Sequence, residues 1–142
     1  MPHVNYLSVL VTGVVIFVLG GLWYSPLLFA KPWTRLMGKT EEEMKAYMAS
    51  PKAKSEMPLM YAMAFVTALV IAWVMAIIVN HFPPQSVLRG AEVGTLCWLG
   101  FAATTSYATA VFSMQPKALW AINSGYNLVS FVLAGAILGV WR

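Results

Sequence analysis

Residues 4–30 contain no charged side chain, and this unbroken apolar run constrains the fold more than any other feature of the chain. About 20 helical residues, each rising 1.5 Å, cross a bilayer core of roughly 30 Å. The run is therefore long enough for a membrane-spanning helix, which we place at residues 6–24. Ser25 and Pro26 would end it, because proline lacks an N–H group and restricts the residue before it.

The rest of the chain repeats this pattern. Hydrophobic residues make up 60% of the sequence and charged residues only 10%, against about 25% charged in soluble domains. A soluble chain of this size could not cover so much apolar surface. Three later runs predict further crossings at residues 58–80, 91–113 and 118–141. We expect an all-α, single-domain integral membrane bundle of four transmembrane helices over residues 1–142.

A polar segment, residues 31–56, separates the first two crossings and holds six of the nine basic residues. Thr40 is followed by Glu41, Glu42 and Glu43, a pattern typical of a helix N-terminus with Thr40 as the cap. The segment therefore predicts a short interfacial helix between the first and second crossings.

The distribution of basic residues predicts orientation. Residues 31–56 and Lys117 hold seven basic residues, whereas Arg89 and Arg142 are the two on the other side. The positive-inside rule then puts residues 31–56 in the cytoplasm and both termini outside, for a multi-pass protein of the cell (inner) membrane. With charges this sparse, we expect the lipid bilayer and no nucleic acid as a partner.

Polar side chains inside the expected crossings are candidate functional residues. The fourth crossing carries two amides and a hydroxyl at helical spacing, and the third carries hydroxyls that could meet them; this candidate polar face comprises Asn123, Asn127, Ser130, Ser106 and Thr109. Such groups need partners in hydrocarbon. They could form an interhelical hydrogen-bond network, bind a ligand head group or line a pathway.

Arg89 and Glu92 form a second candidate, near the start of the third crossing. Their spacing predicts a local ion pair close to a helix N-terminus. If Glu92 faces the bundle instead, it becomes a candidate proton- or cation-linked residue. His3 and His81 could join Glu92 at the outer side as metal ligands, but no ligand spacing supports this site.

No catalytic constellation is recognisable. The chain has no aspartate, and it contains no nucleophile elbow, phosphate-binding loop or zinc-protease motif. Cys97 is the only cysteine, so an intrachain disulfide is impossible. We therefore expect no enzymatic activity, no catalytic residue, no metal and no cofactor.

One motif suggests a family. Trp23-Tyr24-Ser25-Pro26, preceded by Leu19-Gly20-Gly21-Leu22 and followed by Phe29, Lys31 and Trp33, resembles the N-terminal signature of the small bacterial membrane-protein family known as domain of unknown function 1761. Segments 98–101 and 122–126 are similar to that family's third- and fourth-helix segments. The resemblance implies a four-helix membrane domain. It implies no activity, substrate or catalytic residue, because the family is uncharacterised.

Two hypotheses for function follow. In the first, the protein is a non-enzymatic bundle that works by association, as a homo-oligomer or as a small subunit of a membrane complex. Small residues motivate it: Ala64, Ala68, Ala72 and Ala76 form a strip, and Gly135 and Gly139 form a GxxxG pattern. In the alternative, an oligomeric transporter or channel moves ions or small metabolites past Glu92 and the Asn123/Asn127 face.

Overall fold

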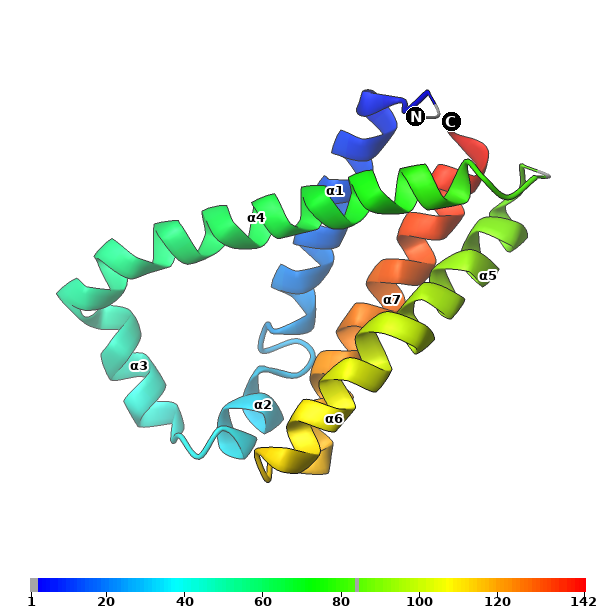
Figure 1. Ribbon diagram of the computed structural model, residues 1–142. Coiled ribbons are helices and arrows are strands. Elements are labelled where there is room, and N and C mark those ends of the chain that lie inside the picture. Colours follow the sequence, from blue (N-terminus) through cyan, green and yellow to red (C-terminus); the bar gives the residue numbers. More distant parts are fainter. Residues whose placement is uncertain (1–2, 84) are drawn as a thin grey trace.

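The computed structural model describes residues 3–83 and 85–142 and is helical, with no strand in these two ranges. In chain order its elements are α1 (Tyr6–Trp23), α2 (Ala30–Leu36), α3 (Glu41–Ala49), α4 (Pro51–Val79), α5 (Val87–Cys97), the π-helix η1 (Trp98–Ala103), α6 (Thr104–Phe112) and α7 (Lys117–Val140). Figure 1 shows both termini at one end of the molecule, beside the connection from α4 to α5.

Three helices in the described ranges, α1, α4 and α7, are long and apolar enough to cross a membrane. The structure therefore does not confirm the prediction of four helices that each span the membrane. The region predicted as the third crossing is divided into α5, η1 and α6, and each piece is too short to span alone. The π-helical stretch interrupts the i→i+4 hydrogen-bond pattern there, which sequence periodicity cannot anticipate.

The closest helix pairing joins α5 to α7. Gly90 on α5 lies so near Gly135 on α7 that a Cβ atom added to either would overlap the other's carbonyl oxygen. Gly94 and Gly139 also face partner backbone, at Phe131 and Ser86. Small residues let helix backbones meet in this way inside a bilayer. The GxxxG pattern predicted on the fourth crossing therefore packs within the chain.

Helix α4 packs against α1 with only part of its length. The alanine strip predicted for close packing is buried at Ala68, Ala72 and Ala76, but Ala64 is exposed. Leu69 on the same helix reaches the backbone of α1 at Gly13. The N-terminal part of α4 extends away from α5 and α7 (Figure 1). Most of the buried residues of α4 thus lie in its C-terminal half.

The polar segment forms two short helices where we expected one. Thr40 caps α3 as predicted, accepting a hydrogen bond of 3.1 Å from the Glu43 N–H. Helix α2 was not predicted. In the structure Pro32 occupies the first turn of α2, where its missing N–H costs nothing. Helix α2 contacts α3 and α7, and α3 contacts α4.

The second crossing was expected at residues 58–80, but α4 begins earlier, at Pro51. Ser50 ends α3 and caps α4, accepting a hydrogen bond from the Ala53 N–H at 3.3 Å. A serine cap followed by proline is a strong start for a helix. Pro58 consequently lies inside α4 and removes one backbone hydrogen bond near its exposed end.

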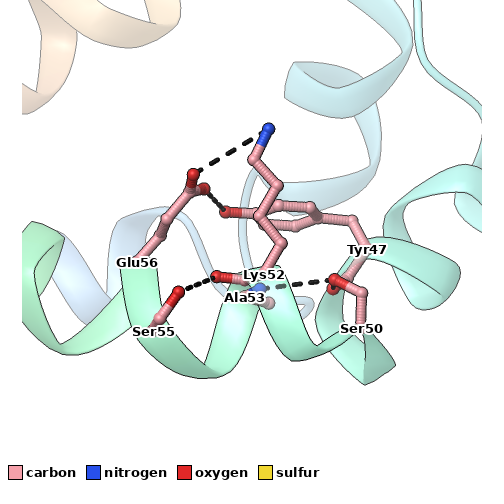
Figure 2. Close-up of polar contacts among 6 residues, drawn as sticks. All are labelled: Tyr47, Ser50, Lys52, Ala53, Ser55 and Glu56. Carbon is pink, nitrogen blue, oxygen red and sulfur yellow. Dashed lines mark hydrogen bonds and ion pairs between the residues drawn. The ribbon is translucent and has the colours of Figure 1, made fainter.

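A polar cluster fixes the elbow between α3 and α4, as Figure 2 shows. The Tyr47 hydroxyl donates a hydrogen bond of 2.8 Å to Glu56, and Lys52 lies 3.8 Å from the same carboxylate. The hydrogen bond to Glu56 raises the pKa of Tyr47 above its ordinary value, because it favours the protonated phenol. The elbow thereby sets the direction in which α4 leaves α3.

Candidate functional site

The Trp23-Tyr24-Ser25-Pro26 motif forms the turn that ends α1. The Tyr24 N–H still bonds to the Gly20 carbonyl at 3.1 Å, and the Ser25 hydroxyl donates to the Leu22 carbonyl at 2.6 Å. The N–H of Ala30, the first residue of α2, donates a hydrogen bond of 3.1 Å to the Ser25 carbonyl. These bonds satisfy backbone groups that the end of α1 would otherwise leave open.

The two aromatic residues of the motif hold α7. The Trp23 indole N–H donates to the Ile122 carbonyl at 3.0 Å, and the Tyr24 hydroxyl donates to Asn123 Oδ1 at 2.7 Å. We call these four residues the aromatic clamp. The Tyr24 ring also meets Trp33 and Tyr126 edge-on, each at a centroid distance of 5.6 Å. The clamp joins the end of α1 to the first half of α7.

Further bonds converge on α7 from its neighbours. The Trp98 indole N–H donates to the Ser124 carbonyl at 3.0 Å. The Trp120 indole N–H donates to Ser106 Oγ at 3.0 Å, and the Tyr126 hydroxyl donates to the Ile16 carbonyl at 3.2 Å. Helix α7 is thus hydrogen-bonded to α1, η1 and α6, which makes it the central element of the bundle.

The five residues of the predicted polar face do not form one site. Asn123 belongs to the aromatic clamp, and Ser106 pairs with Trp120. Ser130 and Thr109 donate to carbonyls of their own helices, at 2.8 and 3.2 Å. Asn127 is half-buried in α7, and its side chain is not among those that bond to a neighbouring helix in the described ranges. A role for these residues in ligand binding or transport stays a prediction.

The π-helix changes the helical register within the predicted third crossing. We assumed an uninterrupted 3.6-residue period across the third crossing, but six residues follow the wider i→i+5 pattern. Positions before and after η1 therefore no longer share the expected face. Thr104, Thr105 and Ser106, just after η1, each donate back to a carbonyl within it, at Gly100, Phe101 and Ala102.

The predicted ion pair between Arg89 and Glu92 is present. Arg89 Nη1 lies 2.9 Å from Glu92 Oε2, and both side chains are about half exposed, at 51% and 49%. The pair stands at the rim of a cavity of about 600 Å³ between the end of α4 and α5–η1. The apolar lining of this cavity, which we call the α4–α5 groove, includes Ile78, Phe82, Val93, Leu96, Cys97 and Phe101.

A model of the family described as "Protein of unknown function (DUF1761)" matches residues 7–139. The chain belongs to this family. No curated protein and no solved structure matches the chain. The motif that carried the resemblance lies inside the matched range, and in this DUF1761 protein it builds the aromatic clamp.

Sequence reasoning missed two features of this DUF1761 protein. It did not pair the motif with Asn123, because the two are separated by 99 residues and no local pattern connects them. It also did not find the α4–α5 groove, whose lining residues come from separate helices. The histidine–glutamate metal alternative gains no support, since no three His, Cys, Asp or Glu side chains in the described ranges are placed to hold an ion.

Proposed function

We propose that this DUF1761 protein is a non-enzymatic integral membrane protein with four crossings that works by associating with a second copy of itself. The fourth crossing would be the continuous helical stretch of α5, η1 and α6, residues 87–112, which is longer than the about 20 residues that a bilayer requires. The engagement of Tyr24, Asn123 and Ser106 in interhelical hydrogen bonds supports a structural role for the polar groups of the bundle.

The observation that carries this proposal is an unpartnered stripe on α4. Its members are large, exposed side chains spaced four and three residues apart: Leu59 (65% exposed), Met63 (56%), Val66 (51%), Val70 (51%) and Trp73 (40%). We call this set the outer stripe. It lies on the side of α4 opposite Ala68, Ala72 and Ala76, which are buried.

The spacing of the outer stripe suits a second helix. Apolar side chains that recur every 3.5 residues form the seam of a helix pair with knobs-into-holes packing. Two copies of one stripe, related by a two-fold axis, provide matching surfaces without another partner. The glycines of α5 and α7 already face each other within one chain, so they are occupied and do not offer a packing face to a second copy.

Cysteine cross-linking in native membranes tests the association. In a Cys97→Ala background, we expect Val66→Cys to form a disulfide-linked dimer on mild oxidation, because residues at a two-fold helix crossing approach within disulfide range. Val111→Cys on α6 is the matched control, since Val111 is 53% exposed and Val66 is 51% exposed. Both variants have the same chance of random collision in the membrane.

The outcomes are distinct. A dimer band for Val66→Cys with none for Val111→Cys supports the proposal, and a scan along residues 59–73 should then peak at positions of the outer stripe. Equal bands for both variants, or no band at any stripe position, would mean that lipid alone covers this face, and association through α4 would be rejected.

A further inference from the structure

The α4–α5 groove has the shape of a binding site for an apolar chain. Its volume of about 600 Å³ lies in the range of about 300–1,000 Å³ that is typical of small-molecule pockets. Leu96 and Phe101 line it and are 66% and 71% exposed, so the groove opens sideways from the bundle. In a bilayer this opening faces the hydrocarbon, from which an acyl chain can enter directly.

The π-helix shapes one wall of this groove. Gly100 of η1 lines it, and a Cβ atom added there would have no atom within 4 Å. The helix backbone therefore lines the groove directly at this point. A residue with a side chain here would make the groove narrower. Irregular stretches of this kind often occur at functional sites.

One guanidinium group, that of Arg89, lines the groove, and a second, that of Arg142, lies beside it against the backbone of Phe82. Arg89 Nη1 donates a hydrogen bond to Glu92. The other N–H groups of the Arg89 guanidinium remain available as donors. Arg142 donates from Nη2 to the carbonyl of Phe82, itself a lining residue, at 3.0 Å. The buried Nε of Arg142 has no hydrogen-bond partner in the described part of the chain. Glu92 is the only acidic residue outside residues 41–56.

We propose that the α4–α5 groove binds one acyl chain of an anionic phospholipid, whose phosphate is held by Arg89 and Arg142. The apolar lining takes the chain, and the guanidinium forks match phosphate oxygens in charge and geometry. The guanidinium groups favour the anionic head group of phosphatidylglycerol over that of phosphatidylcholine, whose quaternary ammonium group they repel. This inference concerns a ligand of each single chain, so it does not depend on association through α4.

Native mass spectrometry of the full-length protein in detergent tests the site. The protein is incubated with phosphatidylglycerol or with phosphatidylcholine of the same acyl composition. We expect one phosphatidylglycerol per chain to survive gas-phase activation, with phosphatidylcholine retained about tenfold less, since a charge-assisted hydrogen bond contributes about a factor of ten. The count of lipids per chain is read separately from the count of chains.

Two variants locate the binding. Leu96→Trp places an indole in the groove and should abolish retention of both lipids, whereas Val111→Trp places an indole at an exposed position of α6 and should not. The double variant Arg89→Gln/Glu92→Gln removes the rim ion pair without leaving a lone charge. It should lower phosphatidylglycerol retention toward the phosphatidylcholine level without reaching it, because Arg142 remains, and Lys117→Gln should leave retention unchanged.

Either of two results would overturn the proposal. Equal retention of the two lipids by the unaltered protein would remove the role of the arginines. Retention that persists in Leu96→Trp would place the lipid elsewhere on the protein. Because Arg89 and Glu92 are half exposed, their double variant is expected to fold, so a loss of binding there is not a loss of structure.

Discussion

At the scale of single residues, the bond between Tyr24 and Asn123 explains why the motif needs a tyrosine. The hydroxyl reaches the amide of another helix at 2.7 Å, while the ring packs against Trp33 and Tyr126. Phenylalanine would keep the ring contacts and lose only the donor. An amide left without its partner in an apolar setting costs more than the bond itself contributes.

We therefore expect Tyr24→Phe to lower the free energy of unfolding in detergent by about 1–2 kcal/mol. Asn123→Leu should cost a similar amount, because it leaves the Tyr24 hydroxyl without its acceptor. In a double-mutant cycle, the combined variant should be more stable than the sum of the two single losses predicts. Strictly additive losses would show that the two side chains do not interact.

At the scale of helices, the crossing of α5 and α7 depends on glycine. At Gly90, a methyl group would meet the backbone of α7, which cannot move aside as a flexible side chain could. Gly21 on α1 has open space around it, with no atom within 4 Å of an added Cβ. Comparing a glycine-to-alanine substitution at these two positions therefore separates the effect of helix packing on stability from the effect of helix propensity.

Gly90→Ala should destabilise the protein by about 3 kcal/mol through overpacking. Gly21→Ala should change stability by less than about 0.5 kcal/mol, or raise it slightly, since alanine favours a helix. Thermal unfolding in detergent measures both, and the yield of monodisperse protein shows whether Gly90→Ala folds at all. Equal effects at the two positions would contradict the close crossing.

The helices also show what the sequence could and could not predict. The predicted runs 6–24 and 118–141 lie within one residue of α1 and α7, and Thr40 precedes α3 as expected, because Pro26 and Thr40 act locally. The start of α4 was wrong by seven residues, since Ser50-Pro51 and Pro58 both suit a helix start. The clamp and the groove could not be predicted, because they join residues that only tertiary packing brings together.

At the scale of the whole molecule, the asymmetry of basic residues predicts its orientation. The polar segment with α2 and α3 lies at the opposite end of α1 from the N-terminus, which Figure 1 also shows. If α1 crosses the membrane, Thr40 and the connection from α4 to α5 face opposite compartments. A bilayer crossing by α5, η1 and α6 then returns the chain to the side of Thr40.

In a Cys97→Ala background, we expect a membrane-impermeant maleimide to label Gln85→Cys in intact cells, and to label Thr40→Cys only after the cells are broken. Both positions are exposed in the structure, so accessibility differs only through the membrane. Labelling of Thr40→Cys in intact cells would reverse the orientation. Labelling of both cysteines in intact cells would contradict a crossing between them.

The aromatic clamp also has a consequence for biosynthesis. Trp23 and Tyr24 leave the ribosome early, but their acceptors, Ile122 and Asn123, follow 99 residues later. At about 5–20 residues per second, roughly 5–20 s pass before the clamp can close. During this interval the indole and phenol groups need other partners, and the interfacial end of a membrane helix offers water and lipid head groups. Closure of the clamp therefore marks the moment at which the last helix joins the first.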